Sequence, residues 1–237
     1  MIRFSLLGSG SKGNAVYVVA PGAKILIDSG FSYKRLCERL AAIGEQIEGL
    51  QAVFVTHEHI DHVRGLGVLS RKLRVPIYIT PATFENLPDG TGQLDNVHYF
   101  EAGSSLRVGD LTLTSFSVSH DAADPVGYVV QNGTAKLGIA TDLGHTPTLV
   151  KMRLAGANAL ILESNHCPQM LLNGTYPPSL QQRIRSKFGH LSNADMTSLL
   201  SELIHDALRF VVLAHISEEN NDRRLAYEMA LGALKGH

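Results

Sequence analysis

The sequence predicts an α/β protein in which sheets of short strands are covered by helices. Three observations support this prediction: aliphatic and β-branched runs of strand length recur along the chain, amphipathic stretches separate several of them, and polar residues directly follow many of the runs. Periodicity leaves two architectures open, a doubly wound sheet and a four-layer sandwich. The 237 residues contain no Pro- or Ser-rich linker and no low-complexity tract, so we expect a single domain over residues 1–237.

Most of the runs expected to form strands end at Gly, Asn, Asp, Ser or Pro, which favour turns. The expected strands are Ile2–Leu7, Ala15–Val19, Lys24–Ile27, Ala52–Val55, Pro76–Ile79, Leu111–Val118, Gly127–Gln131, Leu137–Ala140, Ala159–Leu162 and Arg209–Ala214. The pair Asn132-Gly133 predicts a hairpin turn, so part of the sheet structure is expected to be antiparallel or mixed.

Helices are expected where apolar residues recur at helical spacing. The segment Ser32–Ala42 begins with a Ser in the N-cap position and places Leu36 and Leu40 on one face. The other expected helices are Val63–Leu73, Pro147–Leu154, Asn193–Ala207 and Asp222–Leu234.

The composition bears on location and partners. A formal net charge of −1 gives none of the basic excess that non-specific nucleic-acid binding usually shows. No run approaches the roughly 18 apolar residues of a membrane-spanning helix, and the first apolar run is too short for a signal peptide. The two cysteines, Cys37 and Cys167, have no metal or redox spacing. We therefore expect a soluble cytoplasmic protein with reduced thiols and no membrane association.

Polar residues stand just past the ends of several expected strands. Strands of a packed sheet can bring their ends to one edge, so we expect these side chains to converge there on rigid supports. They are Asp28, His57, His120, Asp142, the segment Glu163-Ser164-Asn165-His166, and His215.

The segment His57-Glu58-His59-Ile60-Asp61-His62 places four candidate metal ligands within six residues. Such close spacing needs a tight loop or the first turn of a helix, and the expected helix Val63–Leu73 follows directly. Burying four polar groups in one loop without a cation would be costly. The motif therefore predicts a metal-dependent hydrolase, in which His57 and His59 share one ion while Asp61 and His62 face a second ion about 3.5–4 Å away.

The remaining ligands must come from other parts of the chain. His120 and His215 are the candidate imidazoles, and Asp142 is the candidate for a carboxylate that bridges both ions. Imidazole and carboxylate ligands suit zinc, manganese or iron, and ligand type alone does not choose among them. The absence of cysteine ligands argues against a closed structural zinc site.

The motif and the strand-end residues together resemble the metallo-β-lactamase superfamily, from Ile2 to about His215. The resemblance implies a four-layer αββα sandwich of two mixed sheets flanked by helices, with a dinuclear site at one edge. It assigns His57, His59 and His120 to the first ion, Asp61, His62 and His215 to the second, and Asp142 to the bridge. Asp28 would support the loop without binding metal, and Glu58 is expected to be an exposed loop carboxylate.

The chemistry of such a site predicts the mechanism. Two cations lower the pKa of a bridging water and stabilise the negative charge that develops during hydrolysis. Asp61 is the expected catalytic residue, because it can take the proton from the nucleophile and later pass it to the leaving group.

The segment Gly189-His190-Leu191-Ser192-Asn193 bears on the substrate. Ser192 and Asp195 form a capping pattern at the start of the expected helix Asn193–Ala207, and a helix N-terminus with a nearby His suits a phosphate. Three cations, Arg183, Arg185 and Lys187, precede it. Taken alone, this pattern also fits an ordinary capped surface helix after a solvated basic stretch. The loop Gly8–Asn14 could approach a substrate backbone closely or only turn between two strands, and taken alone it favours the turn.

The loop Gly8–Asn14, the segment Glu163-Ser164-Asn165-His166 and the segment Gly189–Asn193 together resemble the WalJ (YycJ) branch of the superfamily. That branch is similar to ribonuclease J. That resemblance implies a DNA exonuclease, with 5′→3′ as the expected polarity and with His190, Ser192 and Asn193 near a substrate phosphate. Cys167 departs from the Asp expected after Asn-His in that branch. The chain is also too short for the cap domain of the larger nucleases.

Three functions remain open from sequence, because fold does not settle substrate. The first is a phosphodiesterase acting on nucleic acid, the second a hydrolase of a thioester or lactone, and the third a non-catalytic metal-binding partner in a repair or signalling complex. A complete set of expected ligands argues against the third function. The near-neutral charge keeps the second open.

Overall fold

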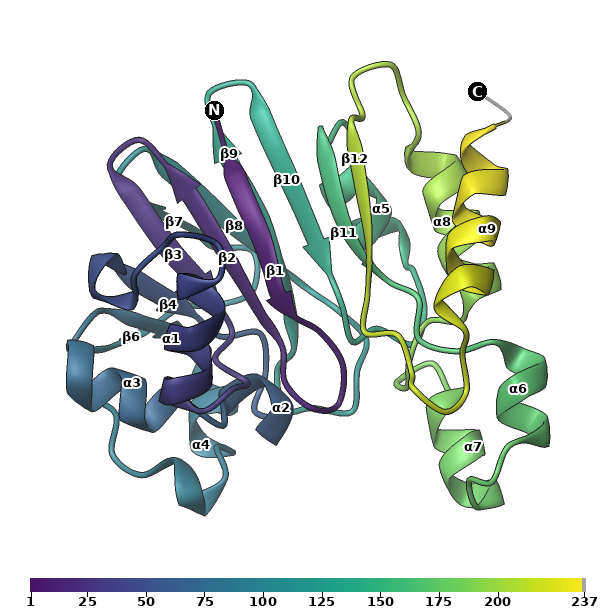
Figure 1. Ribbon diagram of the computed structural model, residues 1–237, viewed down its shortest axis with the longest axis horizontal. Coiled ribbons are helices and arrows are strands. Elements are labelled where there is room, and N and C mark those ends of the chain that lie inside the picture. Colours follow the sequence, from purple (N-terminus) through teal and green to yellow (C-terminus); the bar gives the residue numbers. More distant parts are fainter. Residues whose placement is uncertain (236–237) are drawn as a thin grey trace. The chain divides into compact units, whose positions relative to one another are not determined.

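The computed structural model describes residues 1–235 (Figure 1). These residues pack into two compact units, each with its own hydrophobic core. Unit 1 consists of Met1–Ser115, Ala122–Val126 and Val130–Thr134, and unit 2 consists of Phe116–Asp121, Gly127–Val129 and the chain from Ala135 onward. The expectation of a single domain over residues 1–237 stays a prediction.

Unit 1 contains a mixed sheet in which strand order follows chain order. Its strands are β1 (Arg3–Gly8), β2 (Ala15–Ala20), β3 (Ala23–Ile27), β4 (Ala52–Phe54), β5 (Ile77–Ile79) and β6 (Val97–Tyr99). The first three strands pair antiparallel, and β3 to β6 pair parallel. The parallel part brings the carboxyl ends of β3 and β4 to the same edge.

The core of unit 1 forms between this sheet and its helices. In α1 (Tyr33–Ala41), Leu36 and Leu40 are fully buried, and the Ser32 hydroxyl accepts a hydrogen bond from the Arg35 N–H, as the capping pattern predicts. The remaining helices are α2 (Ile60–Val63), α3 (Leu66–Leu73), α4 (Pro81–Glu85) and the short 3₁₀ helices Ile47–Gly49 and Asp89–Thr91.

A second mixed sheet has the order β12-β11-β10-β9-β8-β7. Its strands are β7 (Ser105–Val108), β8 (Leu111–Ser117), β9 (Val126–Asn132), β10 (Ala135–Ala140), β11 (Ala159–Glu163) and β12 (Phe210–Ala214). Strands β7 and β8 pair antiparallel, whereas β10, β11 and β12 pair parallel. Unit 2 therefore also collects three strand ends at one edge.

The helices of unit 2 are α5 (Thr148–Leu154), α6 (Pro168–Asn173), α7 (Pro178–Ile184), α8 (Asn193–Leu203) and α9 (Arg223–Leu234). Helices α8 and α9 run side by side (Figure 1). Leu199, Leu200 and Ala230 from this pair join the same buried cluster as Leu160 and Leu162 of β11. None of the helices in residues 1–235 is both long and apolar enough to cross a bilayer.

All the expected strands are present, with bounds shifted by one or two residues, and the predicted two mixed sheets flanked by helices are confirmed. The missed strands, β6 and β7, each lie at one edge of a sheet. Both are short and partly exposed, so they lack the continuous apolar run that identified the other strands.

Two expected helices were wrong in extent. The predicted helix Val63–Leu73 is two helices, α2 and α3, separated at Gly65, where the backbone of Phe31 packs so closely that an added Cβ would lie 2.0 Å from its carbonyl oxygen. The predicted helix Asn193–Ala207 ends at Leu203, because Ile204 is extended. The missed helices α4, α6 and α7 are too short to show periodicity, and each starts at a proline.

Candidate functional site

The four-ligand motif of unit 1 forms a loop and the first turn of a helix. His57 follows β4 closely, His59 is the N-cap residue of α2, and Asp61 and His62 lie on its first turn. The ring of His57 lies 4.6 Å from that of His59 and 4.1 Å from that of His62, measured between centroids. His57 and His62 are buried, whereas His59 and Asp61 are partly exposed. The structure thus brings three imidazoles and one carboxylate of the motif together.

Asp28 lies behind His62, at the end of β3. Its Oδ2 is 2.8 Å from His62 Nδ1 and accepts a hydrogen bond from the Thr56 hydroxyl, while its Oδ1 accepts the Thr56 N–H. The carboxylate therefore holds the Nδ1–H tautomer of His62, with the lone pair on Nε2. A carboxylate that orients an imidazole in this way is typical of metal-binding histidines.

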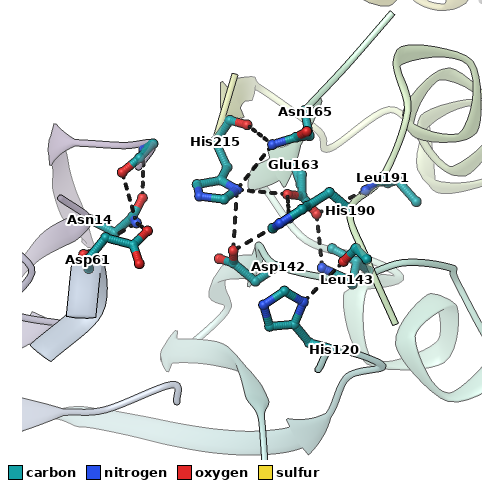
Figure 2. Close-up of polar contacts among 12 residues, drawn as sticks. Asn14, Asp61, His120, Asp142, Leu143, Glu163, Asn165, His190, Leu191 and His215 are labelled. Carbon is teal, nitrogen blue, oxygen red and sulfur yellow. Dashed lines mark hydrogen bonds and ion pairs between the residues drawn. The ribbon is translucent and has the colours of Figure 1, made fainter. Parts of the chain in front are cut away.

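Asn14 is a residue of this site that the sequence did not identify. Its backbone N–H donates to the Asp61 carbonyl at 2.7 Å, and its side-chain Nδ2 lies 3.0 Å from Asp61 Oδ2 and 2.9 Å from His62 Nε2. Figure 2 shows Asn14 directed at Asp61. In the sequence, Asn14 was noted only as the last residue of the loop Gly8–Asn14, which taken alone was interpreted as a turn and which also contributed to the resemblance.

Glu58 differs from its expected role as an exposed loop carboxylate. It is partly buried, and its Oε1 accepts a hydrogen bond of 2.8 Å from the Ala123 N–H. Glu58 therefore helps to fix the loop that carries the motif.

Gly30 is essential to the packing of this loop. A Cβ added at Gly30 would lie 1.7 Å from the Asp61 carbonyl oxygen and 2.5 Å from the Asn14 nitrogen, both of them backbone atoms that cannot move alone. We expect Gly30→Ala to destabilise the protein by about 1–3 kcal/mol through overpacking, measured by urea unfolding. Gly90→Ala is the matched control, because its added Cβ meets nothing within 4 Å. Equal unfolding free energies in the two variants would show that Gly30 is not required here.

Unit 2 brings its own polar residues together at the carboxyl ends of parallel strands. Asp142 follows β10, Glu163 ends β11, and His215 follows β12. The parallel register pairs Ala140 with Leu162 and Glu163 with Ala214, so these residues lie at one sheet edge, as their strand-end positions predict. His190, from the segment before α8, joins them, and ligand atoms of the four residues lie within 4.8 Å of one another.

Glu163 is the centre of this cluster; it was among the strand-end residues expected to converge, but no individual role was predicted for it. It is fully buried, and its Oε2 accepts backbone N–H groups from Leu143 at 2.9 Å and Leu191 at 3.1 Å. Its Oε1 lies 2.8 Å from His190 Nδ1 and 2.9 Å from His215 Nδ1 (Figure 2). Four donors thus converge on one carboxylate, which serves to hold two imidazoles and is already saturated as an acceptor.

The charge state of Glu163 follows from these contacts. Burial raises the pKa of this carboxyl, but the charge of His190 and the hydrogen bonds from His190 and His215 lower it further than burial raises it, so that the pKa lies below its usual value. Glu163 is therefore ionised at neutral pH and accepts an N–H from each imidazole.

The donor set fits a divalent cation. His120 Nδ1 donates to the Gly189 carbonyl at 3.0 Å, and burial lowers the pKa of His120, which favours the neutral ring. His62, His120 and His215 are each held through Nδ1 by a carboxylate or carbonyl, which leaves the lone pair on Nε2, the form that binds metal. Asp142, buried beside His215, adds a carboxylate.

Three of the sequence-predicted site residues have left-handed backbone conformations. The φ angles are 61° at Asp28, 58° at Asp142 and 52° at His215. Residues other than glycine rarely adopt this region, and such strain concentrates at functional sites. Each of the three follows a strand, so the sharp turn sets the direction in which its side chain leaves the sheet.

Ser192 and Asn193 are placed differently from His190. The Ser192 hydroxyl caps α8 by accepting the Asp195 N–H at 3.1 Å. The Asn193 side chain is fully buried, accepts the Ser164 hydroxyl at 2.7 Å, and exchanges two hydrogen bonds with Asn221. Their predicted contacts with a substrate phosphate stay a prediction.

Cys167, which replaces the Asp expected from the resemblance, is the N-cap residue of α6. Its backbone N–H donates to the Asn220 carbonyl at 2.9 Å, and no side-chain capping bond forms. In the structure, Cys167 therefore marks the start of α6.

Comparisons with known proteins show the family to which the chain belongs. The sequence profile of the Beta-lactamase superfamily domain matches residues 23–216. The chain is 39% identical over 227 residues to exodeoxyribonuclease YycJ of Bacillus anthracis, covering 95% of this chain and 86% of that protein. It is 35% identical over 236 residues to exodeoxyribonuclease WalJ of Streptococcus pneumoniae, covering 98% and 88%.

Solved structures show the same fold at lower sequence identity. The crystal structure of the metallo-β-lactamase fold protein YhfI from Bacillus subtilis superposes with a TM-score of 0.76 at 18% identity, covering 98% of this chain and 93% of that one. The profile match over most of the chain, the similarity to YycJ and WalJ, and the shared fold establish that this chain belongs to the metallo-β-lactamase superfamily.

Proposed function

We propose that this protein is a metal-dependent exonuclease that acts on DNA, with 5′→3′ polarity as the expected direction. The observation that carries the proposal is the similarity to the two exodeoxyribonucleases, which extends over 95% and 98% of this chain. Buried oxygen acceptors bond Nδ1 of His62, His120 and His215 and leave the lone pair on Nε2, the tautomer that binds metal. This arrangement supports metal-dependent hydrolysis.

We further propose that two divalent ions bind, zinc or manganese in preference to iron. His57, His59 and His120 would hold one ion, Asp61, His62 and His215 the other, and Asp142 would bridge them. This assignment rests on the superfamily membership and on the donor chemistry within each unit. Asp28 and Glu163 would hold His62 and His215 in the metal-binding tautomer.

When bound, the ions would supply an activated hydroxide and stabilise the charge of the phosphorane-like transition state. Asp61 would take the proton from the nucleophile and return it to the leaving oxygen. His190, whose Nδ1 is held by Glu163, would present Nε2 to the substrate phosphate. Ser192 and Asn193 would also lie near the substrate phosphate, and the hydrogen bonds of their side chains within the protein would fix the segment that carries His190.

End-labelled single- and double-stranded DNA and RNA test this function directly, alongside a panel of thioesters and lactones. We expect metal-loaded protein to release nucleotides progressively from one DNA end, and chelator to abolish the release. Acyl turnover without nucleotide release would establish the thioester or lactone hydrolase instead. Metal binding without any turnover would favour the non-catalytic partner.

We also propose that the protein acts in the cytoplasm. Cys37 and Cys167 are both free thiols, which suits a reducing compartment.

A further inference from the structure

Asn14 is a buried polar residue of unit 1 whose side chain has no role in the mechanism so far. It is the last residue of the loop Gly8–Asn14, and only 6% of its surface is exposed. An asparagine in a Gly-rich loop usually serves the turn. Here its side-chain Nδ2 lies 3.0 Å from Oδ2 of Asp61, the carboxylate proposed to bind an ion and to carry the proton (Figure 2).

The orientation of the Asn14 amide is fixed by a backbone donor. The Gly10 N–H donates to Asn14 Oδ1 at 2.8 Å, so the amide oxygen faces Gly10 and the NH₂ group faces Asp61. The reversed amide would place its NH₂ group against an N–H donor and its oxygen against a carboxylate. These contacts admit one orientation, in which the amide donates to Asp61 Oδ2.

The NH₂ group of Asn14 has an acceptor for each of its two hydrogens. Asp61 Oδ2 is one acceptor, and the Gly10 carbonyl, 3.2 Å from Nδ2, is the other. His62 Nε2 also lies 2.9 Å from Nδ2, but its lone pair is assigned to an ion. The bond to Asp61 therefore does not require a bond to His62, and the amide can hold the carboxylate while His62 binds metal.

The backbone around Asn14 is held independently of the side chain. The Asn14 N–H donates to the Asp61 carbonyl at 2.7 Å, and the Asn14 carbonyl accepts the Gly30 N–H at 2.9 Å. Both bonds can form when the side chain is shortened to alanine, so the loop can keep its attachment to the first turn of α2. The effect of the amide on the Asp61 carboxylate can therefore be measured separately from the effect of the loop.

A neutral amide suits a carboxylate that has to bind a cation. The Asp61 side chain is 17% exposed, so its carboxylate could rotate without a partner that holds it. A lysine or arginine at position 14 could also hold the carboxylate, but its positive charge would repel the ion. The hydrogen bond from Asn14 orients Asp61 without adding charge.

We propose that Asn14 is a positioning residue for Asp61, whose amide fixes the carboxylate in the orientation that binds the ion and transfers the proton. This inference rests on the role proposed for Asp61 and makes that role more specific. It also gives the loop Gly8–Asn14 a function other than a turn or a contact with the substrate backbone.

A double-mutant cycle of metal affinity tests this role, with Asn14→Ala, Asp61→Ala and the combination of both. Competition with a chromophoric chelator measures the binding of zinc. We expect Asn14→Ala to weaken the binding of one of the two ions by about tenfold. In the Asp61→Ala protein the same substitution is expected to cause no further loss, because the amide has no carboxylate to orient.

Asn86→Ala is the control for the loss of an amide in unit 1. Asn86 is exposed, and its Nδ2 donates to the Ala82 carbonyl at 2.9 Å. We expect this variant to bind both ions with unchanged affinity.

Turnover at saturating metal provides the second readout. We expect Asn14→Ala to lower kcat by about 10- to 100-fold and to leave KM for DNA unchanged. Asn14→Asp keeps the size of the side chain and the acceptor for the Gly10 N–H. We expect it to lower kcat as well, because a charged oxygen that repels Asp61 replaces the donor.

Equal losses of metal affinity from Asn14→Ala with and without the Asp61 carboxylate, in a protein that releases nucleotides, would overturn the positioning role and leave the exonuclease standing. Tighter metal binding by Asn14→Ala would also overturn it, by showing that the amide competes with the ion for His62. A raised KM with unchanged kcat would overturn it in favour of a contact between the loop and the substrate. A loss of affinity that requires Asp61, in a protein that releases no nucleotides, would support the positioning role and overturn the exonuclease.

Discussion

Asp61→Asn is expected to lower the rate of nucleotide release by about 10²–10⁴-fold, the contribution of a positioned acid–base group. The substitution keeps the size of the side chain and an oxygen that can accept the Asn14 amide, which lies 3.0 Å from Asp61 Oδ2. The fold is expected to persist, because Asp61 is partly exposed on the first turn of α2. Single-turnover digestion of labelled DNA measures the effect.

Asp110→Asn, at an exposed position of unit 1, is the matched control and is expected to leave the rate unchanged. His62→Ala is expected to give a loss of similar size without unfolding the protein. Near-normal rates for Asp61→Asn or His62→Ala, after metal has been removed and restored, would contradict the roles assigned to these residues.

Glu163→Gln is expected to weaken metal binding by about 10- to 100-fold, although Glu163 is not a proposed ligand. Glu163 accepts four hydrogen bonds, two from backbone N–H groups and two from imidazoles. The side-chain amide of Gln replaces one acceptor oxygen with an NH₂ group. This NH₂ group then faces N–H donors that had bonded the carboxylate, in a fully buried site. His215 then loses the partner that holds its lone pair on Nε2.

Competition with a chromophoric chelator measures the affinity, and urea unfolding of the metal-free protein separates the effect on stability, for which we expect a loss of about 1–3 kcal/mol. Glu202→Gln, which changes an exposed carboxylate paired with Lys151, is the control. Unchanged metal affinity in Glu163→Gln would show that the buried carboxylate serves the fold alone.

Most strands of the fold were predictable because they lie in runs of aliphatic and β-branched residues that end at turn-forming residues. The run Ala159–Leu162 is buried throughout, and its strand extends by one residue to Glu163. Strands β6 and β7 were not predictable, because both are short and partly exposed and neither contains a continuous apolar run. The break at Gly65 was also hidden, since it arises from contact with Phe31, which lies 34 residues earlier in the chain.

For the site, the sequence identified side chains that carry chemistry at strand ends, and the structure brings them together within each unit. The roles of Asn14 and Glu163 were not predicted, because they depend on which residues these side chains contact. Nothing near Glu163 in the chain shows that Leu143, His190 and His215 converge on it, since those residues are 20, 27 and 52 positions away. Similarly, the left-handed conformations at Asp28, Asp142 and His215 could not be predicted, because none of these three positions is a glycine.

The most direct test of metal-dependent DNA hydrolysis is a titration of metal-depleted protein with zinc or manganese, in which bound metal and nucleotide release are followed together. Our assignment predicts no release from the metal-free protein and full release when two ions are bound per chain. Release that persists without metal, or that is complete with one ion bound, would contradict the dinuclear exonuclease.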